Sequence, residues 1–444
     1  MIGTLLMISI IAVPLLVVAA GVKPIAYSEY DCDNGLHVII HEDHTTPIVT
    51  VSVWYHVGSR DEETHRTGFA HLFEHLMFQG SEHVKKQEHF KYIQDVGGTL
   101  NASTSADRTN YFETVPSQYL ALALWLESDR MRSLAITQEN FENQRAVVKE
   151  ERRQRYDNVP YGTLFERLLD TVFTSSGYHW STIGSMEHLD NAQLDDVRAF
   201  HSKYYVPNND TLVLSGDVDP ASAKQLVAQY FGDIPRGAAV THAPVNEPPI
   251  AQQVRVTTTE EVPQTLVAIA FHAPSETHPD AHAVQFLAEI LGGGQSSPLY
   301  HRLVYTEQIA TSIGMHPIQF ESVGLVLIEA MVAAGADPAQ VEKSIWEELA
   351  KVRASAPDAH ALEKARNGML KHVTDQRTSV FSRSQLLSQA HVYFGSAAHA
   401  NEEWQAVEAV TAEDVRRVAQ LFDPAQSAVF TIFPAADGHG ATHE

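Results

Sequence analysis

The sequence predicts an α+β protein of two related domains, each an antiparallel-rich mixed sheet with helices packed on one face. Predicted helices and strands alternate along the chain, and the second half repeats the order of the first. A stretch with four prolines and no apolar periodicity separates the halves. We therefore expect an N-terminal domain at residues 27–233, a linker at 234–250, a C-terminal domain at 251–436 and a disordered tail at 437–444.

Residues 1–22 are predicted to be a leader rather than part of a domain. Residues 2–20 are almost wholly apolar and small residues follow, which is typical of a secretory signal peptide cleaved near Ala20. An uncleaved membrane anchor is the alternative, because the apolar run is barely long enough to span a bilayer. Either interpretation predicts a periplasmic or otherwise extracytoplasmic protein.

The composition excludes some classes of partner. The 444 residues include 31 Lys and Arg against 55 Asp and Glu, which gives a net charge of −24. Such a charge argues against nucleic acid or an anionic membrane as the main partner. The apolar content of 44% is that of a soluble globular protein, and the single cysteine, Cys32, permits no internal disulfide.

The elements of the first half follow from turn residues and apolar periodicity. Asn34-Gly35 predicts a tight turn between two short strands, and Gly97-Gly98 ends a helix over residues 87–95. Strands are also predicted at 36–40, 48–57, 99–104, 110–114 and 211–215, and helices at 68–80, 119–134, 139–157, 166–173, 195–204 and 220–231.

The second half has counterparts for several of these elements. A strand at 266–271 mirrors the long strand at 48–57, and a helix at 280–291 mirrors the helix at 68–80. Residues 413–416 repeat an acidic helix start seen in the first half, and a strand at 428–433 follows them. We interpret this as an internal duplication.

The candidate site is the stretch His71-Leu-Phe-Glu74-His75. Residues four apart on a helix leave the same face one turn apart, so His71 and His75 can reach one divalent ion. Glu74 lies between them and is placed to accept a proton from a metal-activated water. Two ordinary surface histidines are the alternative, because the chain holds 24 histidines.

A third metal ligand is expected from the predicted helix at 139–157. Its end carries two adjacent carboxylates, Glu150 and Glu151. Neighbouring helical residues point about 100 degrees apart, so only one of them can face the histidines. The residues alone leave the choice open.

The histidine motif and a glutamate about 75 residues later resemble the inverzincin peptidases, which include pitrilysin, insulin-degrading enzyme and the mitochondrial processing peptidase. The resemblance implies a zinc endopeptidase with one Zn²⁺ per chain. The ungapped stretch at 97–111 favours Glu151 as the third ligand, beside His71 and His75, with Glu74 as general base. The resemblance to these peptidases also implies that the C-terminal domain is an inactive homologue of the N-terminal domain.

The same resemblance implies a substrate site and a partner. The strand at 99–104 would be an edge strand to which peptide substrate adds at Asn101 and Ala102. Without the resemblance, Asn101 would be interpreted as an ordinary edge residue. Active relatives also use an Arg and a Tyr, but the matching positions here are Val304 and Thr311.

These two departures predict a heterodimer in which a related partner chain brings the Arg and the Tyr. A homodimer that uses other residues is the alternative. A non-catalytic assembly subunit of the same fold is the rival function, and a periplasmic binding protein is a weaker third possibility. Bound zinc near one per chain would favour the enzyme.

Overall fold

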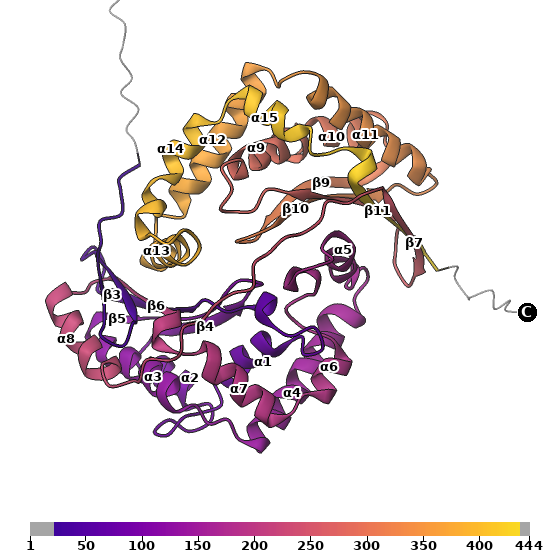
Figure 1. Cartoon of the computed structure of the whole chain (residues 1–444). Coiled ribbons are helices and arrows are strands. Elements are labelled where there is room, and N and C mark those ends of the chain that lie inside the picture. The colour runs from indigo at the N-terminus through magenta and orange to yellow at the C-terminus, as the bar shows by residue number, and fades with distance from the viewer. Residues whose placement is uncertain (1–21, 436–444) are drawn as a thin grey trace, which may run out of the picture.

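The computed structural model describes residues 22–435. The predicted leader, apart from residue 22, and the predicted tail at 437–444 lie outside these residues. The chain forms two halves, each built on one sheet, and the two sheets face one another across the molecule (Figure 1). Within residues 22–435, no helix combines the length and the apolar character that crossing a bilayer requires.

The N-terminal sheet has six strands in the order β1-β2-β6-β3-β5-β4. Only β2 and β6 run parallel, and all other neighbours are antiparallel. The tight turn predicted at Asn34-Gly35 joins β1 to β2, and Gly35 has the positive φ of 89° that such turns favour. The strands are β1 (Ser28–Asp31), β2 (His37–Glu42), β3 (Ile48–Tyr55), β4 (Thr99–Thr104), β5 (Thr109–Pro116) and β6 (Asp210–Gly216).

The C-terminal sheet repeats this plan with five strands in the order β7-β11-β8-β10-β9. Its single parallel pair is β7 with β11, which matches β2 with β6. The predicted fold class and its duplication are therefore confirmed. The strands are β7 (Val254–Glu260), β8 (Leu266–Ala273), β9 (Ala310–Gln319), β10 (Gly324–Val332) and β11 (Ser427–Pro434).

Helices cover the outer side of each sheet (Figure 1). The N-terminal half contributes α1 (Phe69–Leu76), α2 (Glu88–Asp95), α3 (Leu120–Ser133), α4 (Gln138–Arg152), α5 (Leu164–Val172), α6 (Met186–Asn191), α7 (Leu194–Tyr204) and α8 (Pro220–Phe231). The C-terminal half contributes α9 (Ala281–Gly292), α10 (Pro298–Tyr300), α11 (Pro338–Ala354), α12 (Ala359–Asp375), α13 (Val380–Phe394), α14 (Glu403–Ala409) and α15 (Ala412–Ala419).

Two of these helices begin at the same local signal. Asp219 caps α8 by accepting a hydrogen bond from the Ser222 N–H (2.8 Å), and Asp337 caps α11 by accepting one from the Ala339 N–H (2.9 Å). A proline follows each aspartate at the first helical position, where its missing N–H costs no hydrogen bond.

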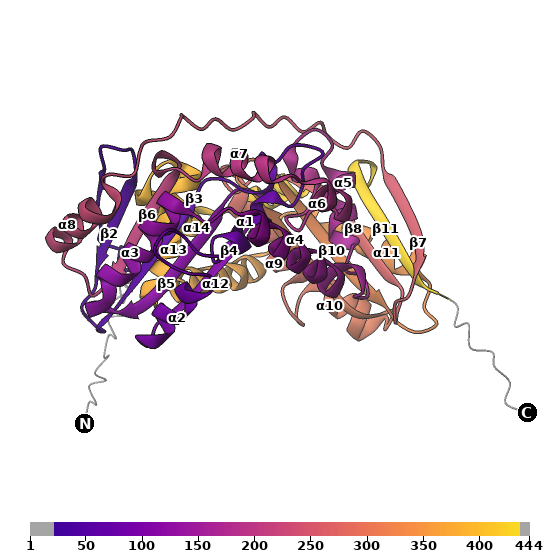
Figure 2. The ribbon, with the colours of Figure 1, turned by 90° about the horizontal axis from the view of Figure 1, so that it is seen from below.

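The residues between α8 and β7 form neither helix nor strand in the described chain. They run along the outside of both halves (Figure 2). This course is what the predicted linker at 234–250 requires, although its exact limits stay a prediction.

The inner face of the N-terminal sheet is covered by a helix from the other half. Ile39 and Val213 of this sheet pack on Leu387 and Ala390 of α13, and all four side chains are buried. A polar contact supports the apolar one, because the Gln385 side chain accepts a hydrogen bond from Asn110 Nδ2 (2.8 Å). Figure 1 shows α13 between the two sheets.

The C-terminal sheet receives a helix from the N-terminal half in return. Leu164, Leu168 and Leu169 of α5 pack on Ala268 and Phe430 of the C-terminal sheet. The two helices hold corresponding places, since α5 follows α4 as α13 follows α12. The sequence predicted helices on one face of each sheet, and the structure adds this reciprocal exchange on the other face.

A buried ion-pair cluster also joins the halves. Arg60 of the N-terminal half lies 2.9 Å from Asp107 and 2.7 Å from Glu321, which belongs to the turn between β9 and β10. His56 Nε2 approaches the same Glu321 oxygen at 2.7 Å. Removing one partner would leave a buried charge unpaired, so the cluster fixes how the halves meet.

The exchange of α13 makes a testable prediction. Leu387→Ala should lower the free energy of unfolding of the whole chain by about 2–5 kcal/mol, because it opens a cavity at a fully buried contact. Leu421→Ala is the matched control, since Leu421 is 44% exposed and its loss should change stability by less than about 0.5 kcal/mol. Urea unfolding followed by circular dichroism measures both. Equal losses for the two variants would contradict the assigned role of α13.

Candidate metal centre

The helix α1 carries the histidine motif and is fixed at both its start and its apolar face. Glu62 accepts hydrogen bonds from the N–H groups of Gly68 (2.9 Å) and Ala70 (2.8 Å), which satisfies free donors at the helix start. Gly68 has a φ of 94°, and a Cβ there would lie 2.8 Å from the Ile183 carbonyl oxygen. The apolar face is buried through Phe69, Leu72, Phe73 and Leu76.

Three metal-donor side chains converge beside this helix. Glu151 Oε2 lies 3.8 Å from His71 Nε2 and 3.3 Å from His75 Nε2. Donor atoms at 2.0–2.1 Å around a tetrahedral zinc lie about 3.3–3.4 Å apart, so the set fits that ion. Burial and the neighbouring His75 lower the pKa of His71 to about 4, which keeps its imidazole neutral, as a metal ligand must be.

The structure separates the two adjacent glutamates of α4. Glu151 faces the histidines, and its second carboxylate oxygen lies 2.7 Å from Arg155 Nη1. Glu150 points to solvent, where it pairs with Arg153 (3.1 Å) and accepts a hydrogen bond from Gln154 (2.9 Å). Of the two carboxylates that the sequence left open, only that of Glu151 can join the donor cluster.

The resemblance to the inverzincin peptidases implies an acidic residue seven positions before Glu151, but this chain has Gln144 there. Gln144 is buried, and its side-chain amide donates to Asn143 (2.8 Å). Glu142 does not take its place, because its half-exposed carboxylate pairs with Arg145 (2.6 Å) on the helix surface.

Glu74 lies beside the donor cluster without being part of it. Its Oε2 accepts a hydrogen bond of 2.6 Å from the Thr104 hydroxyl. Burial raises the pKa of Glu74, while the Thr104 hydrogen bond and His75 oppose that rise. Sequence reasoning missed Thr104, although strand alternation offered a signal, because Thr104 and Ala102 point to the same face of β4.

Asn101 and Ala102 lie on β4, which forms an edge of the N-terminal sheet and contacts α1. The Ala102 N–H donates to the Asn101 side-chain oxygen (2.9 Å). That amide is therefore capped by a side chain that another strand could displace. Asn101 is exposed and Ala102 is half-buried.

Comparisons with known proteins cover most of the chain. A family model described as insulinase, peptidase family M16, matches residues 37–185, and one described as the peptidase M16 inactive domain matches residues 191–369. The chain is 31% identical to the zinc protease PqqE of Helicobacter pylori over 359 residues, which span 80% of this chain and 78% of that protein.

The chain belongs to the insulinase family, peptidase family M16. The crystal structure of a protease from Helicobacter pylori superimposes with a TM-score of 0.87 at 28% identity and covers 92% of this chain and 100% of its own. The probable mitochondrial-processing peptidase subunit beta of Arabidopsis thaliana is 24% identical over 401 residues, which span 88% of this chain and 75% of that protein. The predicted membership of the inverzincin family is thus confirmed.

The inactive-domain match covers the counterpart of the metal centre in the second half of this M16 chain. The β-ladders make Gln319 of β9 equivalent to Thr104 of β4, since each closes the hairpin beside its central strand. Gln319 accepts a hydrogen bond from Gln285 of α9 (2.8 Å), in the place of the Thr104–Glu74 contact. An uncharged amide thus stands where the first half has a potential base.

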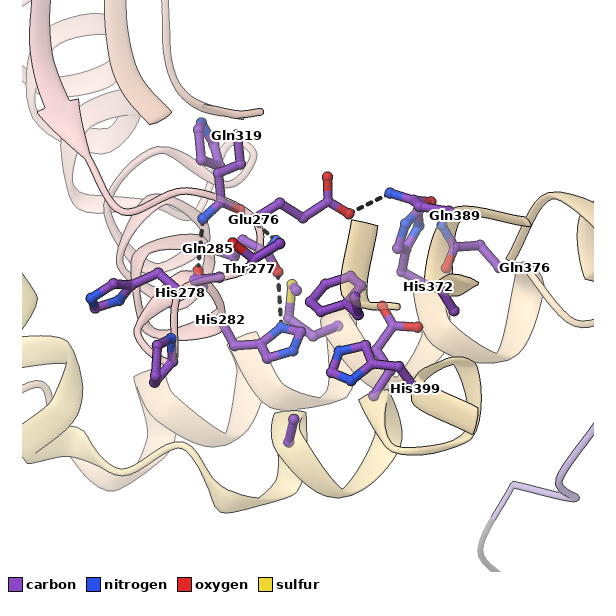
Figure 3. A pocket seen from close by; sticks show the side chains of 18 of the residues that line it. Glu276, Thr277, His278, His282, Gln285, Gln319, His372, Gln376, Gln389 and His399 are labelled. Atoms are coloured by element: carbon purple, nitrogen blue, oxygen red, sulfur yellow. Dashed lines mark hydrogen bonds between the residues drawn. The ribbon is translucent and has the colours of Figure 1, made fainter. Parts of the chain in front are cut away.

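A cavity of about 670 Å³ surrounds this counterpart (Figure 3). His282 and His372 line it from two different helices, with Glu289 beside them. Among residues 22–435, however, the three groups whose donors lie close enough to share an ion do not include these side chains. The second half keeps the cavity without the metal-donor geometry.

The positions of the missing Arg and Tyr lie in the same half of this M16 chain. Val304 is in the short π-helix His301–Thr306 that follows α10, and Thr311 is the second residue of β9. Arg302, the nearest cation in sequence, is held by Glu307 (2.7 Å), Glu348 (3.1 Å) and Glu347. These ion pairs leave Arg302 unavailable as a substitute.

The different positions of Glu150 and Glu151 on α4 lead to a testable prediction. Glu151→Gln should weaken zinc binding more than about 100-fold, because it removes a charged donor from the cluster. Glu150→Gln is the matched control, and its zinc affinity should stay near that of the unchanged protein, since Glu150 pairs only with surface residues. Competitive zinc titration with a chelating dye measures both. A larger loss for Glu150→Gln would reverse the assignment.

Proposed function

We propose that this chain is a zinc-dependent endopeptidase subunit that hydrolyses peptides or unfolded polypeptide segments. The observation that carries the proposal is a His–His–Glu donor cluster with a second carboxylate, that of Glu74, beside it and outside the donor set. Family membership and relatives named as zinc proteases support the same reaction class. The organisation fits hydrolysis better than binding alone, because a binding site needs no base.

His71, His75 and Glu151 would hold one Zn²⁺ per chain. When bound, zinc supplies a Lewis acid that polarises a carbonyl and lowers the pKa of water. The charge of Glu151 also offsets part of the charge of the ion. Arg155 holds the second oxygen of Glu151, which limits its rotation and keeps one oxygen turned to the histidines.

Glu74 would act as the general base and then as the general acid. Its carboxylate accepts the proton of the attacking water while that water forms a bond to the scissile carbonyl carbon. The same group returns the proton to the leaving amine as the C–N bond breaks. Thr104 positions the carboxylate through a 2.6 Å hydrogen bond, and burial raises the pKa of Glu74 towards the range in which both steps are efficient.

Substrate would bind as an added strand along β4. The edge position leaves main-chain groups of β4 free of a neighbouring strand, and the N–H of Ala102 is capped only by Asn101. An extended peptide can replace that cap with its own carbonyl group and lie parallel to the edge. The proximity of β4 to α1 would bring a bond of this peptide near Glu74.

The active form would be a heterodimer with a related chain that supplies the missing Arg and Tyr. Val304 and Thr311 offer neither a cation nor a phenol hydroxyl, and Arg302 is already paired with glutamates. A relative named as a subunit of a processing peptidase supports division of labour within the family. A homodimer remains the alternative, and a periplasmic location stays a prediction from the leader.

Glu74→Gln should keep zinc and lose peptide hydrolysis by a factor of about 10² to 10⁴ or more, because the amide cannot take the proton of water. Glu63→Gln is the matched control, since Glu63 precedes the same helix with its side chain 75% exposed. Turnover of a quenched peptide and zinc content are measured together, in the presence of the partner chain. Full turnover by Glu74→Gln would refute the assigned base.

The lone chain should turn over peptides poorly even when fully loaded with zinc. A missing donor to the transition state costs on the order of 10² to 10³ in rate, and adding the partner should restore this factor. The test is to purify the chain alone, measure its mass in solution, and assay it before and after adding a co-encoded relative without the histidine motif. Rapid hydrolysis by the lone chain would exclude the heterodimer, and zinc-loaded inactivity with every partner would favour a non-catalytic subunit.

A further inference from the structure

A second cluster of metal-donor side chains lies where the β1–β2 hairpin meets α13. Glu29, His37 and His391 each present one donor atom, and all three atoms lie within 4.8 Å of one another. The donor types are those of the cluster on α1, namely two imidazoles and one carboxylate. The cluster belongs to different elements from those that carry Glu74.

The fold brings these residues together by strand register. Glu29 lies opposite Ile39 and Asp31 lies opposite His37 in the β1–β2 ladder, so the four side chains share one face of the sheet. Ile39 packs against α13, which identifies this face as the one that α13 covers. His391 is in the last turn of α13 and completes the cluster from the other half of the chain.

His37 has the environment of a metal-binding histidine. Its Nδ1 lies 2.8 Å from Asp31 Oδ1, which fixes the ring and leaves Nε2 as the free nitrogen. The Nε2 atom is buried, has no hydrogen-bond partner, and lies 3.5 Å from Glu29 Oε2. A buried nitrogen without a partner costs free energy, and a metal ion would supply the missing contact.

His391 stacks on His37, with ring centroids 3.7 Å apart and an angle of 4° between the planes. Burial and the neighbouring His37 lower the pKa of His391 to about 4, so its ring stays neutral. Parallel rings direct their nitrogen lone pairs side by side, so the His391 ring must turn about its Cβ–Cγ bond for its nitrogen to converge with His37 Nε2 on one ion. Glu29 is 40% exposed, which leaves room for entry from solvent.

We propose that Glu29, His37 and His391 form a second zinc site, which clamps α13 onto the N-terminal sheet. Asp31 is a positioning residue that holds the His37 ring. Two nitrogen donors and one carboxylate suit zinc, and water can take the fourth position on the exposed side. Because the ligands come from both halves, binding at this site favours the docked arrangement of the halves over any in which α13 leaves the sheet.

The experiment uses the full-length chain carrying His71→Ala and His75→Ala, so that the centre on α1 no longer binds zinc. Equilibrium dialysis against Zn²⁺ should leave one zinc per chain. Adding His37→Gln or His391→Gln to this chain should abolish the binding of that zinc ion. Asp31→Asn should weaken zinc binding at this site about 10- to 100-fold, because the His37 ring loses its hydrogen-bond partner.

Two variants make the result specific. Glu29→Gln changes an exposed side chain, so its expected loss of affinity cannot come from unfolding. His399→Gln removes another histidine near the end of α13, where it stacks on Phe394, and should leave the zinc in place. Zinc should also raise the melting temperature of the His71→Ala, His75→Ala chain and have no effect once His37 is replaced.

Absence of zinc in the His71→Ala, His75→Ala chain would overturn the proposal and leave His37 and His391 as a metal-free stack of two rings. Zinc that persists at full affinity after both His37→Gln and Glu29→Gln would overturn it equally. Neither result bears on Glu74, because hydrolysis is tested separately on the chain with His71 and His75 intact.

Discussion

Each sheet of this protein is apolar on both faces, and each half of the chain covers only the outer face of its own sheet with its own helices. All seven residues of β6 are buried, as are seven of the eight residues of β3. Such strands cannot leave a face in water without exposing a large apolar surface. The reciprocal placement of α5 and α13 covers the inner faces of both sheets, so each half completes the packing of the other.

This constraint explains where chemistry can occur. Helices cover the sheet faces and strand pairing satisfies the main-chain groups inside each sheet, so the strand edges are where another chain can pair. The donor cluster on α1 and α4 lies near one such edge, β4, and the cavity of the second half lies near the equivalent strand β9. The two sites therefore lie beside corresponding edge strands, and they differ in that Glu74 contacts Thr104 in the first whereas Gln285 contacts Gln319 in the second.

The sequence predicted the features that depend on local spacing. Residues four apart on a helix gave His71 and His75, and apolar patterning gave the strands that became β3, β8 and β11. Features that depend on distant contacts could not be predicted. The apolar positions of α13 indicate a helix but not which sheet it covers, and Thr104 becomes important only because β4 lies against α1. The same holds for His37 and His391, which no motif connects.

The helix exchange also has a consequence for biosynthesis. The last strand of the N-terminal sheet ends at Gly216, whereas α13 begins at Val380. At a ribosomal rate of about 5–20 residues per second, the inner face of that sheet waits roughly 10–30 s for its cover. Through this interval the nascent chain presents an apolar surface that a holding chaperone can occupy. The chain must therefore be protected during synthesis for longer than its local folding would require.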